Sequence, residues 1–207
     1  MSRYTGPRLK KMRALGLELP GLSRKSIERR PYPPGQQGAG GRRRKKSAYG
    51  LQLLEKQKIR YNYGVGERQL RRLVTEARAS REETGGKLLQ LLERRLDNVV
   101  YRAGFAPTIP AARQLVNHGH IRLNDHKADI PSMRISAGDK ITLRERSKNL
   151  DVVLAALADA DSNDVRPEWL SFDAEKGAIT IQALPDADSI QFELDVQQVI
   201  EFYSRMM

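Results

Sequence analysis

The sequence predicts an α+β fold in three parts: a basic extended arm, a helical region, and a helix-turn-helix that leads into a small antiparallel sheet. Residues 1–50 contain 14 basic and 2 acidic residues but few large apolar side chains, so we expect them not to form a core alone. Farther along the chain, apolar residues recur with the 3.6-residue period of a helix. From His120 the period becomes two, which is typical of strands.

Composition excludes several classes of protein. The chain has 207 residues, a mass of 23.4 kDa and no cysteine, which excludes a disulfide scaffold, a thiol nucleophile and any metal site built on cysteine. It contains no apolar run of the roughly 18 residues that a transmembrane helix requires, and its N-terminus lacks the apolar segment of a signal peptide. We therefore expect a soluble intracellular protein.

The charge is distributed unevenly along the chain. The formal net charge of +12 combines +21 in residues 1–150 with −9 in residues 151–207. A basic region of this size indicates a polyanionic partner. We favour nucleic acid over an anionic membrane, because a membrane-binding segment should pair its basic residues with a large apolar helix face.

The basic arm, assigned to residues 1–48, is expected to be mostly irregular. It contains YPPGQQG (32–38) followed by GGRRRKKS (40–47), and proline and glycine disfavour regular structure. At most, we expect a short helix around residues 23–30. Three roles remain open: an arm that becomes ordered on phosphates, a disordered tail, or a localisation signal.

Helical periodicity predicts three helices after the arm. The first covers residues 49–58, the second begins within 63–70 after a glycine break and ends at Gly85 and Gly86, and the third covers 87–102. The positions expected to face the core are Leu70, Leu73, Val74, Ala77, Leu88, Leu89, Leu92, Leu96, Val99 and Val100. The arginines of the third helix, Arg94, Arg95 and Arg102, are expected to lie outside that core.

A helix-turn-helix follows. Residues 104–107 form the expected turn, Thr108 is the expected N-cap, and Pro110 falls in the first turn, where a missing N–H costs little. The short helix 111–117 should then stop at Gly119, which suits the left-handed conformation of a C′ residue.

The remaining elements are expected from alternation and turn residues. Strands are predicted at 120–123, 140–144, 178–183 and 190–194, with a turn at Asn124 and Asp125. A short helix is predicted at 152–158, and a terminal helix from the spacing of Val196, Val199, Ile200 and Tyr203.

No pattern of catalytic or metal-binding residues stands out. Glu82 and Glu83 are adjacent on a helix and so do not face each other as an acid/base pair should. His118, His120 and His126 match no familiar spacing of zinc ligands. We therefore expect no enzyme activity, catalytic residue, metal or cofactor.

Polar residues gather instead on the helix-turn-helix and the strands that follow. Arginine and lysine neutralise phosphates, whereas asparagine and glutamine reach base edges or ribose hydroxyls. A helix-turn-helix that reads DNA is the alternative, but the second helix has only about two turns and leads directly into a hairpin. The aromatic content of 6% also disfavours stacking on single strands. We expect recognition of folded RNA through its shape. The residues are Arg94, Arg95, Arg113, Gln114, Asn117, His118, His120, Arg122 and Lys140.

Several longer motifs resemble those of a known family. ERRLDNVVYRAGFAPT (93–108), ARQLVNHGH (112–120) and GDKITLRERS (138–147) are similar to the bacterial small-subunit ribosomal protein S4 family, in its zinc-free form. The similarity extends, in the same order, to YPPGQQG, YGLQLLEKQK (49–58), YGVGERQL (63–70) and the terminal FYSRMM (202–207).

This resemblance implies the domain organisation. The arm covers residues 1–48, a helical domain comprises 49–92 and is closed by the C-terminal helix 195–207, and an S4-type RNA-binding domain with an acidic C-terminal portion covers 93–194. The exact fold of the acidic segment is left open. Because phosphate would repel it, we expect it to face protein or solvent.

The resemblance also implies the function. Members of this family are structural constituents of the small ribosomal subunit and bind its RNA early in assembly, at a multi-helix junction in the 5′ domain. The implied neighbours are ribosomal proteins S5 and S3 and the messenger RNA where it enters the subunit, a place that bears on decoding accuracy. The implied location is a ribosome in the cytoplasm, or in the plastid stroma for an organellar protein.

Charge and resemblance together give the candidate RNA-binding residues. Those that match the family's RNA-facing helix and strand are Arg113, Gln114, Asn117, His118 and His120. The other candidates are Arg3, Arg42, Arg43, Arg44, Lys45, Lys46, Lys56, Lys58, Arg68, Arg71, Arg94, Arg95, Thr108 and Arg122.

One departure from the family and two alternatives accompany this interpretation. Many members bind zinc through four cysteines in the arm; since this chain has none, we expect RNA contacts to order its arm. An S4-type domain also occurs fused to pseudouridine synthases, but residues outside the domain leave no room for a catalytic domain. The second alternative is a stand-alone S4-domain RNA-binding factor, which the long arm and the full-length similarity disfavour.

Overall fold

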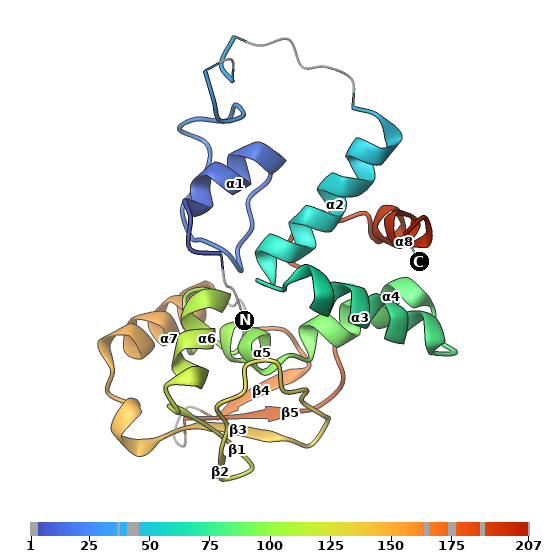
Figure 1. Ribbon diagram of the computed structural model, residues 1–207. Helices are drawn as coiled ribbons and strands as arrows, with labels where there is room; N and C mark the ends of the chain where they lie inside the picture. Colours follow the sequence, from blue (N-terminus) through green and yellow to red (C-terminus); the bar gives the residue numbers. More distant parts are fainter. Residues whose placement is uncertain are drawn as a thin grey trace. The chain divides into compact units, whose positions relative to one another are not determined.

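The computed structural model describes residues 4–36, 38–40, 46–163, 166–173, 177–186 and 189–206. The chain forms two compact units, one comprising Met1–Leu88 with Ile190–Met207 and the other Leu89–Ser189. Helices occur together with a five-stranded antiparallel sheet, which confirms the predicted α+β class (Figure 1). No helix in the described ranges is long and apolar enough to cross a membrane.

The first unit is helical. The second of the predicted helices is α3, and its apolar stripe is buried at Leu70, Leu73, Val74 and Ala77, as predicted. The C-terminal helix packs against two helices that lie far earlier in the sequence, α2 and α3 (Figure 1). The helices are α1 (Arg8–Leu15), α2 (Ala48–Asn62), α3 (Glu67–Ala79), the start of α4 (Thr84–Glu93) and α8 (Val196–Ser204).

The N-terminal arm is more ordered than the sequence predicts. Its helix is α1 rather than residues 23–30, which form turns. Met12, Leu19 and Leu22 are buried in a small cluster, against which Tyr61 and Phe192 pack. The arm has few apolar residues, but α2 and the segment before α8 supply the rest of the apolar surface that the cluster requires. Part of the arm thus has an apolar cluster that the sequence analysis did not expect, while the ordering of the arm by RNA contacts stays a prediction.

The predicted helix 87–102 is two helices. Helix α4 already begins at Thr84, so Gly85 and Gly86 start a helix rather than end one, and α5 covers Leu96–Arg102. Between them, Arg95 has an extended backbone (φ −69°, ψ 137°) and forms a β-bridge with Arg134.

A buried ion pair spans this break. Glu93 is 0% exposed and accepts two hydrogen bonds from Arg102, Nε to Oε2 at 3.0 Å and Nη2 to Oε1 at 2.9 Å. Asn98 Nδ2 donates to the same carboxylate at 2.7 Å. Arg95 and Arg102 are each 5% exposed, so the expectation that they lie outside the core was wrong. Both arginines are buried because each has a buried carboxylate as partner.

The second unit packs helices against a sheet. The helix-turn-helix consists of α5 and α6 (Ile109–Asn117), and Thr108 caps α6 by accepting a hydrogen bond from Ala111 N. Gly119 has φ +72° and Asn124 and Asp125 also have positive φ, as the predicted helix stop and hairpin turn require. The strands are β1 (Ile121–Leu123), β2 (His126–Lys127), β3 (Lys140–Leu143), β4 (Leu170–Asp173) and β5 (Ala178–Ile181).

The acidic segment is part of this unit's fold. A 3₁₀ turn (Glu145–Ser147) leads to α7 (Asp151–Asn163), which is longer than the predicted 152–158, and β4 was not predicted. The strand order is β2-β1-β3-β5-β4, so β5 continues the sheet beside β3. Helices α5, α6 and α7 lie on one side of the sheet (Figure 1). Gly104 lies against α7, where an added Cβ would be 2.5 Å from Ala160 Cβ.

Residues 190–194, predicted as a strand, form no strand. Their backbone is held by side chains of α2 instead: Lys58 Nζ donates to Glu193 O at 3.2 Å, and Glu55 Oε2 accepts from Asp195 N at 3.0 Å. Phe192 turns toward the apolar cluster of the arm. The alternating pattern therefore reflects one partly buried side chain, that of Phe192, and not a sheet.

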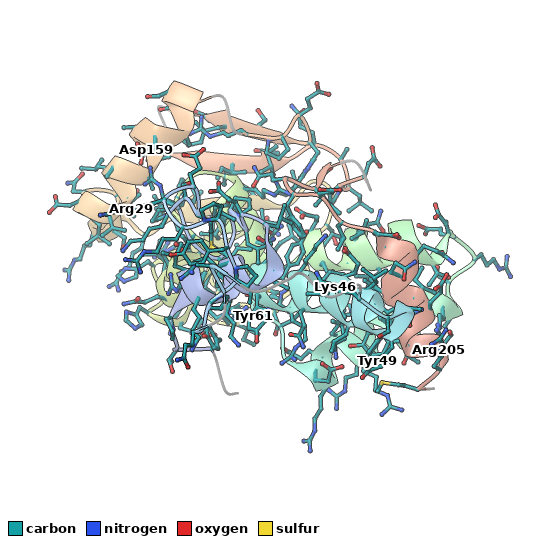
Figure 2. All side chains as sticks on the ribbon, turned by 90° about the horizontal axis from the view of Figure 1, so that it is seen from above. Arg29, Lys46, Tyr49, Tyr61, Asp159 and Arg205 are labelled. Carbon is teal, nitrogen blue, oxygen red and sulfur yellow. The ribbon has the colours of Figure 1, made fainter. Side chains whose placement is uncertain are left out.

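Glu67 on α3 links α8 to the rest of the unit through a hydrogen bond. Tyr203 donates a hydrogen bond to Glu67 Oε1 at 2.7 Å, and Lys56 Nζ lies 3.3 Å from Oε2. Lys56 also lies over the ring of Phe202, 4.3 Å from its centroid. The rings of Tyr49 and Phe202 are tilted to each other by 32° with centroids 5.7 Å apart, and Figure 2 labels Tyr49 on α2.

Replacing Tyr203 with phenylalanine is expected to lower the free energy of unfolding by about 1 kcal/mol at neutral pH. Partial burial disfavours the charge on Glu67, but the hydrogen bond from Tyr203 and the nearby Lys56 and Arg60 outweigh it, so the pKa of Glu67 is lowered from 4.5. This stabilisation is complete above pH 4.5 and is lost as the pH falls through the lowered pKa. Thermal melts of both proteins should therefore differ at pH 7 and converge in acid. Equal melts at pH 7 would contradict this role of Tyr203.

Candidate nucleic-acid interface

The sheet of the second unit has one apolar and one basic face. Ile121, Ile141 and Ile179 are buried on the face toward the helices. Arg122 is paired across the strands with Lys127 on β2 and Thr142 on β3, and residues directly opposite in an antiparallel sheet share a face. Lys140, two residues before Thr142, lies on that face too. Arg122, Lys127 and Lys140 are exposed, and they form what we call the basic sheet face.

A second polar surface lies at the end of α6. Because Leu115 and Val116 are buried, Gln114 and Asn117 are exposed on the opposite side of the helix, and His118 follows them. The rings of His118 and His120 are 6.1 Å apart. We call Gln114, Asn117, His118 and His120 the α6 terminus.

His120 connects the α6 terminus to the end of β3. Its Nδ1 lies 2.8 Å from Ser147 Oγ, and its carbonyl accepts a hydrogen bond from Arg144 N at 2.8 Å. Arg144 is exposed. The structure therefore adds Arg144 to this place, which was not among the expected RNA-binding residues although it continues the alternation of Lys140 and Thr142.

Arg113 and Arg95 meet at one buried carboxylate. Asp97 is 0% exposed and accepts a two-pronged contact from Arg95, Nε to Oδ1 at 3.0 Å and Nη2 to Oδ2 at 2.9 Å. Arg113 donates to the same Oδ2 through Nε at 3.0 Å and through Nη2. The Arg95 side chain is 7% exposed and that of Arg113 18%. Arg95 therefore lies inside the unit. Arg113 lies at its surface, and one edge of its guanidinium group faces the buried carboxylate.

The other candidates of the second unit have local roles. Arg94 is half-buried, and its Nε donates to Ile135 O at 2.8 Å, which holds the loop before β3. Thr108 is buried, and its hydroxyl serves as the N-cap of α6.

The candidates of the first unit fall into two groups, those held in ion pairs and those exposed to solvent. Lys56 and Lys58 are held in ion pairs, Lys56 with Glu67 and Lys58 with Glu55 at 2.7 Å. Lys46, Arg68 and Arg71 are exposed, and Figure 2 shows Lys46 at the start of α2. The candidates that lie outside the described residues are Arg3, Arg42, Arg43, Arg44 and Lys45.

Among the residues that the structure describes, no group of three or more His, Asp or Glu side chains could hold a metal ion. The chemistry that the two surfaces offer is that of binding: cationic groups for phosphates, and amide and imidazole groups for bases or ribose.

Comparison with known proteins identifies similar chains. Residues 3–93 match the family described as "Ribosomal protein S4/S9 N-terminal domain", and residues 94–141 match the "S4 domain". "Small ribosomal subunit protein uS4B" of Nitrosomonas europaea is 58% identical over 207 residues, which is the full length of both chains. "Small ribosomal subunit protein uS4" of Methylobacillus flagellatus is 56% identical over the same length. The Geobacillus stearothermophilus protein of that name is 48% identical over 205 residues, 99% of this chain and 100% of the relative.

Proposed function

This chain belongs to the small ribosomal subunit protein uS4 family, and from that membership we propose that it is a primary binder of small-subunit ribosomal RNA, acting at a multi-helix junction of the 5′ domain. Proteins of this family are structural constituents of the small ribosomal subunit and bind its RNA; they are not enzymes. The precedence in assembly, the place on the RNA and the residues that contact it are the proposal.

The observation that carries the proposal is the pairing of the basic sheet face with the α6 terminus on one folded unit. Lysine and arginine on a rigid sheet are held at fixed spacings, so they can match phosphates of a folded RNA. Gln114 and Asn117 add groups that distinguish ribose and base edges from phosphate. The exposed cations of α3, Arg68 and Arg71, extend the electrostatic attraction.

The acidic segment fits the same proposal. Helix α7 carries Asp151, Asp159 and Asp161 and no basic residue, so its outer side is unsuited to phosphate. We place it toward solvent or toward other ribosomal proteins. By the same reasoning from the family, we propose that S5 and S3 are neighbours, that messenger RNA enters the subunit nearby, and that the protein contributes to assembly and to decoding accuracy.

Binding to protein-free ribosomal RNA tests this function. We expect the purified protein to form a one-to-one complex with small-subunit RNA and to protect the 5′-domain junction from chemical probes. Reconstitution without this protein should leave later proteins unbound. Protections scattered over all domains, or binding only after other proteins are present, would contradict a primary role. A stand-alone RNA-binding factor would not sediment stoichiometrically with the small subunit.

Reversing two charges tests the basic sheet face. Arg122→Glu combined with Lys140→Glu is expected to lower the dependence of log K on log salt by about 2 units, because each lost phosphate contact removes about one. Both side chains are exposed, so the thermal melt should be unchanged. Filter binding across a salt series measures the slope. A wild-type slope would show that this face does not contact RNA.

A further inference from the structure

Asp97 is a buried carboxylate that accepts hydrogen bonds from two arginines on different elements. Its Oδ1 accepts from Arg95 Nε and from Asn98 N, both at 3.0 Å, and its Oδ2 accepts from Arg95 and Arg113. Arg95 alone already provides a two-pronged partner for the carboxylate. The contact with Arg113 links this carboxylate, in the first turn of α5, to the helix α6 that carries the α6 terminus.

We propose that Asp97 is a positioning residue for RNA recognition: it fixes the guanidinium of Arg113 on α6, so that this arginine discriminates between RNA shapes instead of acting as a mobile cation. This inference rests on the proposed function. The contact through Nε and Nη2 occupies one edge of the guanidinium and fixes the plane of the group. The side chain is 18% exposed, so part of it remains at the surface.

The charge balance of the site predicts the consequence of removing the carboxylate. Two guanidinium groups converge on Asp97, and without its negative charge they repel each other. Arg95 is the more deeply buried, and its backbone forms a bridge with Arg134. Arg113 is the more exposed, so it is the side chain that would move outward. It would then attract any phosphate, whatever the shape of the RNA.

The test compares affinity for folded 5′-domain RNA with affinity for a duplex of equal length, across a salt series. Asp97→Asn should lower the ratio of the two affinities about tenfold or more, which corresponds to the loss of one hydrogen bond to a charged group. It should raise the salt slope for the duplex by about one unit. Asp97→Asn combined with Arg113→Gln should return that slope to the wild-type value. The matched control is Glu168→Gln, which makes the same change of charge at an exposed position and should alter neither quantity.

These readouts separate positioning from mere stability. A variant that is only partly folded loses the same factor of affinity for both RNAs, so the ratio and the slope stay unchanged. Wild-type values of both in folded Asp97→Asn would overturn the proposal. If that variant does not fold, Arg113→Lys decides, since it leaves the Arg95–Asp97 pair intact. It should lower the ratio at an unchanged slope, and a wild-type ratio would overturn the proposal.

The proposed function fails in a different way. If the wild-type protein itself shows no preference for the folded RNA, the function is wrong before any variant is compared. If the wild type discriminates and the Asp97 and Arg113 variants discriminate equally well, the function stands and the positioning role is wrong.

Discussion

Arg102→Ala is expected to destabilise the second unit by about 3–5 kcal/mol, the largest loss of stability that we predict for this chain. Glu93 is fully buried, and the substitution removes two of its hydrogen bonds while leaving its charge in place. Arg102 also donates to Ser189 O, so the end of the unit loses a contact as well. Urea unfolding followed by circular dichroism measures the change.

A matched control and a double variant sharpen this prediction. Arg122→Ala removes an exposed arginine from the same unit and should change stability by no more than about 0.5 kcal/mol. Replacing both Glu93 and Arg102 with methionine should cost less than Arg102→Ala, because no unpaired charge remains buried. Equal stability of Arg102→Ala and the wild type would mean that the ion pair does not support the junction of α4 and α5.

The second large effect concerns RNA binding. Replacing Arg42, Arg43, Arg44 and Lys45 with serine is expected to lower the salt slope of binding to 5′-domain RNA by about 3 units. The sequence places no acidic residue between Glu28 and Glu55, so no neighbour in the sequence neutralises this run. An unchanged slope would show that the run does not contact phosphate. Substitution is preferable to deleting the arm, because the deletion would remove the buried Met12, Leu19 and Leu22.

Local patterns predicted the elements around the helix-turn-helix. Thr108 as N-cap, Gly119 as the helix stop, and Asn124 with Asp125 as the hairpin turn act through their own backbone conformation, and the structure confirms each of them. Such signals can be found in a sequence because they depend on neighbours only a few residues away.

The features that were missed depend on distant residues. The break between α4 and α5 depends on residues 131–135. Their backbone exchanges hydrogen bonds with the backbone of residues 94–97. The order in the arm depends on Tyr61 and Phe192. Arg95 and Lys56 were placed on polar surfaces from their charge, but their partners Asp97 and Glu67 stabilise them in buried positions. Periodicity does not show which carboxylate a buried cation will meet.

The same limit applies to the candidate interface. The exposed positions of Gln114, Asn117 and Arg122 follow from helical and strand periods and could be predicted. The position of Lys127 opposite Arg122 and that of Arg144 beside His120 follow from strand register, which the sequence alone leaves open.

A salt titration of the wild-type protein distinguishes recognition of folded ribosomal RNA by its shape from general attraction to phosphate. The protein is titrated with folded 5′-domain RNA and, separately, with a plain duplex of equal length. We expect a preference for the folded RNA of about 10³-fold, the lower end for specific nucleic-acid complexes, that persists as the salt concentration rises. Equal affinities that fall together with salt would contradict it and reduce the protein to a general polycation.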